Sequence, residues 1–181
     1  MQIETQRLIL RQWKEEDKTP FFRLNSDKEV MAFFPNVLTK EHSDALADKI
    51  HHHIATKGWG CFAVERKDTN QFIGFIGLFE PTYQTHFTPC TEIGWRLHKD
   101  HWKQGFATEG ARAVLEYAFH SLQKKEIVSF TTPQNRPSIA VMERIGMTRD
   151  WSGDFDHPNV EVGHPLRPHV LYRIQAESYT Q

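Results

Sequence analysis

The residues with the clearest chemical use lie in one short segment, Gln104-Gly-Phe-Ala-Thr108, between a β-rich stretch and an amphipathic stretch. The first turn of a helix leaves backbone N–H groups without partners, and the aligned peptide dipoles add partial positive charge there. Gly105 lets the backbone approach phosphate oxygens or adopt a positive φ, small Ala107 avoids crowding, and Thr108 adds a hydroxyl. The segment therefore predicts a helix start that binds a diphosphate without a lysine.

The plainer alternative for Gly105 is a turn glycine that binds nothing. Its context favours a ligand, because the turn follows a strand-like segment, residues 91–97, and opens the most amphipathic stretch of the chain. Neither the GxxxxGK pattern of nucleoside triphosphate sites nor the GxGxxG pattern of dinucleotide sites occurs. Those two ligand classes are therefore not expected.

The 11 histidines raise the question of a metal site. Three are consecutive, His51 to His53, but neighbouring helical residues point about 100° apart and cannot converge on one ion. Other histidines lie in or beside the polar segment 152–168, where surface solubility is the plainer explanation and a lining of the acceptor site the alternative. Cys61 and Cys90 lack the paired CxxC of a zinc site. We expect no metal.

Periodicity and turn chemistry predict the elements that position the glycine turn. The hairpin turn Asp68-Thr69-Asn70 joins two β-rich runs, and a long polar loop is expected over residues 152–168. The predicted strands are 7–12, 59–67, 71–79, 91–97, 126–132, 147–151 and 169–176, and the predicted helices are 15–26, 39–57, 135–145 and one that begins at the glycine turn. This order predicts a mixed α/β fold.

Two helices have a predicted buried face, because apolar residues recur in them at helical intervals. The residues expected to be buried are Ala45, Leu46, Ile50 and Ile54 in the helix 39–57, and Ala111, Val114, Leu115, Ala118, Phe119 and Leu122 in the helix after the glycine turn. Pro20 is expected in the first turn of the helix 15–26, or at a kink in it.

The composition fits one globular domain with its own core, since 181 residues carry 39% apolar and 25% charged side chains. A net charge of -1 gives no basic footprint, so nucleic acid is not an expected partner. The longest apolar stretch, residues 72–79, is far short of the ~20 residues of a membrane span. Residues 1–12 lack the apolar core of a signal peptide. We expect a cytoplasmic protein without a membrane partner.

Three segments resemble the GCN5-related N-acetyltransferase (GNAT) superfamily, as does the order of elements. They are Trp102-Lys-Gln-Gly-Phe-Ala-Thr-Glu109, Asn135-Arg-Pro-Ser138 and Glu143-Arg-Ile-Gly-Met147. The opening Glu4-Thr-Gln-Arg-Leu-Ile-Leu-Arg11 and the strand Glu92-Ile-Gly-Trp95 resemble the branch that contains the ribosomal-protein N-terminal acetyltransferases. The likeness covers nearly the whole chain.

This resemblance implies a single domain over residues 1–181 with the acyl-CoA N-acyltransferase fold. That fold is α/β (α+β), with a mixed and mostly antiparallel sheet whose central parallel strands splay apart and are flanked by helices. It also implies acetyl-CoA (coenzyme A) as cosubstrate, with the pyrophosphate on the glycine turn and the backbone amide of Leu97 on the thioester carbonyl. The cofactor contacts so predicted are Leu97, Gln104, Gly105, Phe106, Ala107, Thr108, Asn135 and Ser138.

Acetyl transfer to an amine needs a base, a polarised carbonyl and a proton for the departing sulfur. Glu92 is the first candidate for the base, and a solvated or salt-bridged carboxylate is its alternative reading. Ser138 is expected to orient or relay a proton, with helix capping as the alternative. Asn135 either hydrogen-bonds the pantetheine arm or caps its helix. Many family members carry a proton-donating tyrosine where this chain has Met142, so the acid must be another group or water.

The expected acceptor is a primary amine, either a protein N-terminus or a small amine such as an antibiotic, a polyamine or an amino acid. A non-catalytic CoA-binding regulatory module is one alternative function. A hydrolase with Cys61 or Ser138 as nucleophile is another, although no GxSxG elbow occurs. Acceptor specificity is expected in the first two helices and in the loop 152–168. The sequence does not determine the oligomeric state, and a homodimer is one of the alternatives.

Overall fold

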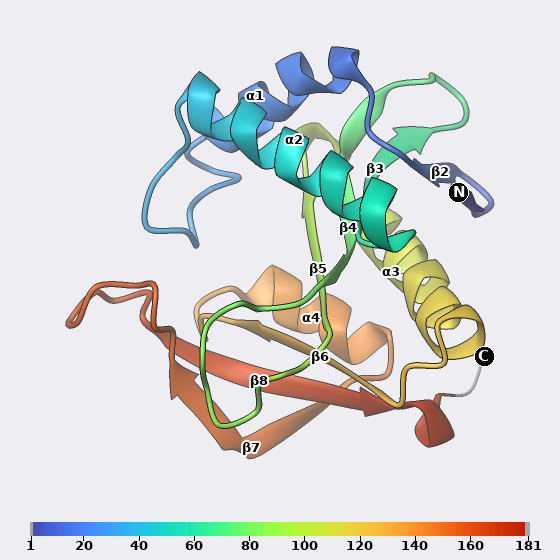
Figure 1. Ribbon diagram of the computed structural model, residues 1–181. Coiled ribbons are helices and arrows are strands. Elements are labelled where there is room, and N and C mark those ends of the chain that lie inside the picture. The colour runs from blue at the N-terminus through green and yellow to red at the C-terminus, as the bar shows by residue number, and fades with distance from the viewer. Residues whose placement is uncertain (1, 180–181) are drawn as a thin grey trace. The chain divides into compact units, whose positions relative to one another are not determined.

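The computed structural model describes residues 2–179 and divides into two compact units (Figure 1). The first unit comprises Met1–Leu78 and Gly94–Val114, and the second comprises Phe79–Ile93 and Leu115–Gln181.

The strands of the first unit follow one another in the sheet in chain order. They are β1 (Gln2–Glu4), β2 (Leu8–Arg11), β3 (Cys61–Arg66), β4 (Phe72–Phe79) and the end of β5 (Glu92–Leu97). The first four are antiparallel neighbours, so the predicted hairpin of β3 and β4 is confirmed. The strand β1 was not predicted, because its three residues are too few for an alternation of apolar and polar residues to be recognised.

Two helices of the first unit agree closely with their predicted bounds, α1 (Lys18–Ser26) and α2 (Lys40–Lys57). A short 3₁₀ turn, Glu15–Asp17, precedes α1, and Pro20 lies in the first turn of α1, where no helical N–H bond is lost. The hydroxyl of Thr39 accepts the His42 backbone N–H at 3.3 Å and caps α2.

The predicted buried face of α2 is partly wrong. Ile50 and Ile54 are buried as expected, but Ala45 is exposed and Leu46 only partly buried, and Ser43 and Ala47 face the core instead. The reason is a buried hydrogen bond of 3.0 Å from the Asn25 side-chain amide to the Ser43 hydroxyl, which makes a polar position of α2 an inward one.

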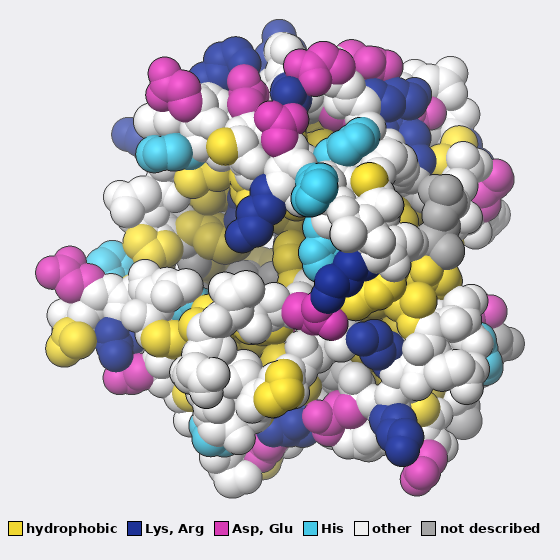
Figure 2. All heavy atoms as spheres, viewed as in Figure 1, with side chains coloured by type: hydrophobic (Ala, Val, Ile, Leu, Met, Phe, Trp, Pro, Cys, Tyr) yellow, Lys and Arg dark blue, Asp and Glu magenta, His cyan; other side chains and the backbone are white. Residues whose placement is uncertain are grey.

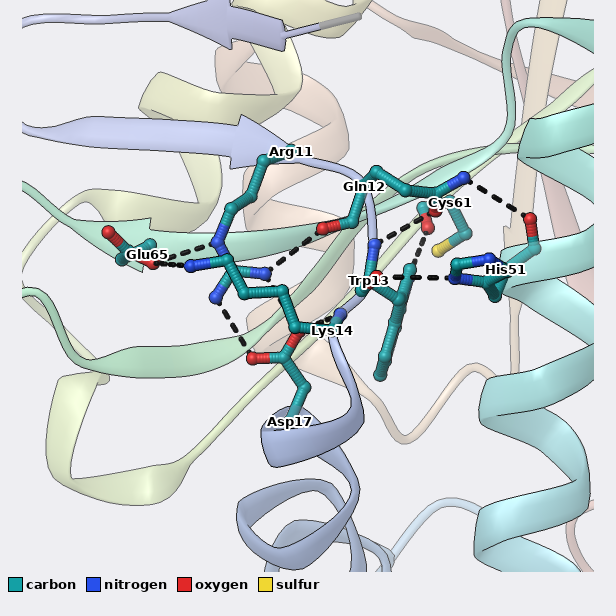
Figure 3. Close-up of polar contacts among 8 residues, drawn as sticks. All are labelled: Arg11, Gln12, Trp13, Lys14, Asp17, His51, Cys61 and Glu65. Atoms are coloured by element: carbon teal, nitrogen blue, oxygen red, sulfur yellow. Dashed lines mark hydrogen bonds and ion pairs between the residues drawn. The ribbon is translucent and has the colours of Figure 1, made fainter.

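Arg11 joins three segments of the first unit (Figure 3). Its guanidinium makes two hydrogen bonds to the Asp17 carboxylate, at 2.7 and 2.9 Å, and a third to Glu65 at 2.7 Å. The Trp13 indole N–H donates to the Cys61 carbonyl at 2.8 Å nearby. These bonds fix the end of β2 against the 3₁₀ turn and against β3.

Figure 2 shows acidic and basic side chains intermixed over α1 and α2, so no single sign of charge dominates there.

The second unit holds β6 (Glu126–Thr131), β7 (Thr148–Asp156), β8 (Pro168–Gln175) and α4 (Arg136–Arg144). β6 pairs with β8 and β8 with β7, both antiparallel. The beginning of β5 pairs with β6 in parallel at Glu92↔Val128. The buried core of the second unit includes Phe87, Val128 and Leu171.

The loop expected over residues 152–168 is shorter than predicted, because β7 continues to Asp156. The register of β7 against β8 shifts between Asp150 and Phe155, and pairing resumes at Phe155↔His169. The Phe155 ring then packs on Phe87, with ring centres 4.9 Å apart. A bulge interrupts the alternation that would have revealed a long strand, and the irregular segment is reduced to residues 157–167.

The helix after the glycine turn is α3 (Phe106–Glu116), which continues into a π-helical turn, Tyr117–Ser121. The residues predicted to be buried are so at Ala111, Val114, Leu115, Ala118 and Phe119, whereas Leu122 is only partly buried. The predicted fold class, a mixed and mostly antiparallel sheet with flanking helices, is confirmed. None of the helices in residues 2–179 is long and apolar enough to cross a membrane.

Candidate active site

The glycine turn in the first unit has the backbone that the sequence predicts. Lys103 and Gly105 both have positive φ, 58° and 83°, so two residues just before α3 lie in the left-handed region. The Glu109 N–H donates to the Gly105 carbonyl at 2.9 Å and is an early bond of the helix. The amides of Phe106, Ala107 and Thr108 precede it, at the positions where a helix start has donors free for an anion.

Arg7 braces this turn, and sequence reasoning missed it. Its guanidinium donates to the Gln104 carbonyl at 2.9 Å and to the Glu109 carboxylate at 2.6 Å, and it lies 4.4 Å from the ring centre of buried Phe106. A Cβ built at Gly105 would lie 3.4 Å from the guanidinium. A cation therefore stands beside the predicted phosphate site.

Glu109 binds the opening segment of the chain to α3 with several donors. The Thr5 hydroxyl and the Arg7 backbone N–H donate to one of its oxygens at 2.6 and 2.8 Å. Burial works against the charge of Glu109, but the hydrogen bonds from Thr5 and Arg7 outweigh it and lower the pKa of this carboxyl. Glu109 is thus a structural acid that keeps Arg7 in place.

Leu97 ends β5 with a buried side chain, and its carbonyl accepts the Trp102 indole N–H at 2.9 Å. The backbone here is tightly packed against β4, because a Cβ added at Gly74 would lie 2.1 Å from the Arg96 carbonyl oxygen and 2.8 Å from the Leu97 Cα. Only glycine fits at that position. Gly74 therefore sets the position of the Leu97 backbone, whose amide is predicted to bind the thioester.

In the second unit, Asn135 caps α4. Its side-chain oxygen accepts the Ser138 backbone N–H at 3.3 Å, and its amide donates to the Thr131 hydroxyl at 3.0 Å. The capping role that was one of the two alternatives for Asn135 is therefore present. Ser138 is partly buried in the first turn of α4. The predicted contacts of both residues with the pantetheine arm stay predictions.

Glu92, the predicted base, begins β5 with a partly buried side chain. None of the ion pairs found in residues 2–179 involves it, so the salt-bridged alternative lacks a partner there. Burial raises the pKa of Glu92 to about 8. Burial is the larger cause, and the charge of Glu92 the second, of a rise in the pKa of Cys90 to about 11. The same two causes raise the pKa of Tyr83. Met142 is buried.

The predicted site residues fall in both units. Leu97 and the turn at Gln104–Thr108 belong to the first unit, and Glu92, Asn135 and Ser138 belong to the second. No group of histidine, cysteine or carboxylate side chains within residues 2–179 could hold a metal ion. Arg7 was missed because nothing in the local sequence distinguishes it from a surface arginine.

Comparison with known proteins identifies the family to which the chain belongs. Residues 7–148 match the acetyltransferase (GNAT) domain family. The uncharacterized N-acetyltransferase YnaD of Bacillus subtilis is 34% identical over 151 residues, which are 83% of this chain and 84% of that protein. The chain therefore belongs to the GNAT family and is an N-acetyltransferase.

Solved structures agree with this assignment. A GNAT-family acetyltransferase from Bacillus anthracis superposes with a TM-score of 0.80 and 28% identity, over 98% of this chain and 99% of that one. Mycobacterium smegmatis RimJ in complex with CoA-disulfide superposes with a TM-score of 0.76 and 21% identity, over 96% of this chain and 84% of that one. At that identity, the likeness to RimJ shows a shared fold only.

Proposed function

We propose that this enzyme transfers the acetyl group of acetyl-CoA to a primary amine and holds the pyrophosphate on the turn at Gln104–Thr108. The observation that carries the proposal is the geometry of this turn. Gly105 has a φ of 83°, and three backbone amides precede the Glu109 N–H, which donates to the Gly105 carbonyl. The Arg7 guanidinium lies beside the turn. A pyrophosphate supplies the negative charge that these donors suit. No divalent cation is needed for such binding.

Glu92 is the proposed base. A carboxyl group with a pKa near 8 takes up a proton far more readily than an ordinary carboxylate, and a catalytic base works best when its pKa lies near the working pH. Glu92 takes a proton from the ammonium group, the neutral amine attacks the thioester carbon, and the carbonyl oxygen takes up charge against a backbone amide. The attacking nitrogen, now positively charged, gives its extra proton to water as the C–S bond breaks. The Leu97 amide is the proposed donor, and water supplies the proton to the sulfur.

The hydrolase alternative has little support in these surroundings. Cys61 is buried at 2% exposure, and the raised pKa of Cys90 keeps its thiol protonated at neutral pH. Ser138 has a backbone N–H bonded to the cap residue Asn135, but no histidine or carboxylate is found hydrogen-bonded to its hydroxyl in residues 2–179. A serine nucleophile needs such a base.

The proposal is tested by thiol release from acetyl-CoA in the presence of amines. The panel contains amino acids, peptides with free N-termini, polyamines and aminoglycosides, and mass spectrometry identifies the product. We expect amine-dependent thiol release with the acetyl group on nitrogen. Binding of acetyl-CoA without acetylation of any amine would instead support the non-catalytic CoA-binding module.

A further inference from the structure

Arg96 in the first unit has surroundings that the proposed chemistry does not explain. It lies on β5, and its guanidinium donates to the Asn25 side-chain oxygen at 2.6 Å. The guanidinium carbon lies 4.2 Å from the ring centre of Phe34 and 5.3 Å from that of Phe75. An amide and two aromatic rings thus surround this cation, and all of them belong to the same unit.

The charge of Arg96 has no carboxylate partner in residues 2–179. Its Nε is closed off from solvent without an acceptor there. The carboxylates that follow α1, Asp27 and Glu29, both bind Lys99, at 3.0 and 2.5 Å. By contrast, Arg11 of the same unit binds two carboxylates. Burial lowers the pKa of Arg96 to about 10, so at neutral pH the group is still a cation. An unpaired charge so placed is costly unless a ligand completes it.

We propose that Arg96 binds a carboxylate of the amine acceptor, which makes amino acids and similar amino carboxylates the substrate class. Asn25 occupies one terminal nitrogen, which leaves Nε and the other terminal nitrogen on one edge of the guanidinium. That edge matches the two oxygens of a carboxylate. The proposal rests on the proposed acetyltransferase function and narrows its acceptor.

Phe34 packs against the Arg96 guanidinium. Its ring lies over the guanidinium and is itself 41% exposed, in the segment between α1 and α2. A large exposed apolar side chain over a cation is a contact that an incoming ligand can displace. We therefore expect Phe34 to move aside when the acceptor carboxylate binds.

The same arrangement disfavours polycationic acceptors. A polyamine or an aminoglycoside brings several positive charges toward the Arg96 guanidinium, and like charges at close range repel and weaken binding. The unpaired arginine thus selects against these acceptors as well as for a carboxylate.

Matched acceptor pairs test the proposal. Each amino acid is compared with its primary amide, which keeps the amine and the side chain but removes the carboxylate charge. We expect the amino acid to have a kcat/KM higher by about 10- to 100-fold, the range of a charge-assisted hydrogen-bonded contact. Arg96→Gln is expected to lower the ratio of the two kcat/KM values, acid over amide, to about 1, and Arg96→Lys to keep part of the preference.

The control is Arg23→Gln, which removes an exposed arginine of α1 and is expected to keep the full preference. Equal turnover of acids and amides by the unmodified enzyme would overturn the inference and leave the acetyltransferase function intact. The absence of any turnover would count against the proposed function. In that case calorimetry compares the binding of N-acetyl amino acids with the binding of their amides. The inference fails if the acids bind no more tightly than the amides, or if their advantage does not depend on Arg96.

Discussion

Glu92 carries the proposed proton transfer, and its surroundings determine the pH at which it can act. Its carboxyl is partly buried at the start of β5, with no ion pair in residues 2–179 to stabilise the negative charge. Desolvation alone accounts for the rise of its pKa to about 8. The group is therefore mostly protonated at neutral pH and becomes a base as the pH rises.

The pH dependence of kcat/KM tests this role. Because the base must be ionised in the free enzyme, kcat/KM is expected to rise with pH and to level off above about 8. Glu92→Gln is expected to lower kcat/KM by about 100-fold or more and to remove that inflection. Exposed Glu161→Gln serves as the matched control and should keep the wild-type profile. An unchanged profile in Glu92→Gln would assign the base to another group.

At the scale of elements, ionic contacts hold the opening segment of the chain in place. Arg7 and Glu109 connect it with the glycine turn and the first turns of α3. Arg11 connects β2 with Asp17 and Glu65. The first contact is largely exposed and the second is buried, so their removal has different consequences.

Removal of the Arg7 brace is expected to affect cofactor binding more than folding. In Glu109→Gln the ion pair is lost but the amide can still accept from Thr5, so the turn persists with a less fixed Arg7. We expect the Kd for acetyl-CoA to rise roughly twofold to fivefold, in keeping with a solvent-screened ion pair, with kcat nearly unchanged. A large fall in kcat at an unchanged Kd would show that Glu109 acts on the chemistry instead.

Removal of Arg11 is expected to affect folding. Arg11→Ala leaves the buried Asp17 carboxylate without its guanidinium, which is expected to lower the free energy of unfolding by about 3–5 kcal/mol. Urea denaturation measures this loss, and Arg23→Ala on the exposed face of α1 is the control. A loss below about 1 kcal/mol would mean that the network contributes no more than a surface ion pair.

For the whole molecule, the sequence predicted what is local and periodic. The capping of α2, the hairpin of β3 and β4 and the buried face of α3 all follow from residue spacing. The β7 bulge interrupts its alternation, and the inward position of Ser43 depends on a partner, Asn25, in another helix. Such features have no signature within their own segment.

The candidate site likewise has one part that could be predicted from the sequence and one part that could not. The glycine turn at Gly105 is contiguous in the sequence and could be predicted, and a positive φ, one of the two reasons given for its glycine, is present. The Arg7 brace pairs residues 102 positions apart, and the unpaired state of Arg96 depends on which carboxylates the fold places elsewhere. A single sequence does not contain these pairings, whereas the structure of the first unit does.

The proposed binding of acetyl-CoA depends on the glycine turn as the site of the pyrophosphate, and calorimetry with acetyl-CoA tests this role directly. Gly105→Glu puts a negative charge at the start of α3 and is expected to weaken binding by about 100-fold or more. Gly163→Glu is the matched control, because Gly163 has a similar φ of 84° and open space around it, and it should bind as the wild type does. Wild-type affinity in Gly105→Glu would contradict the account.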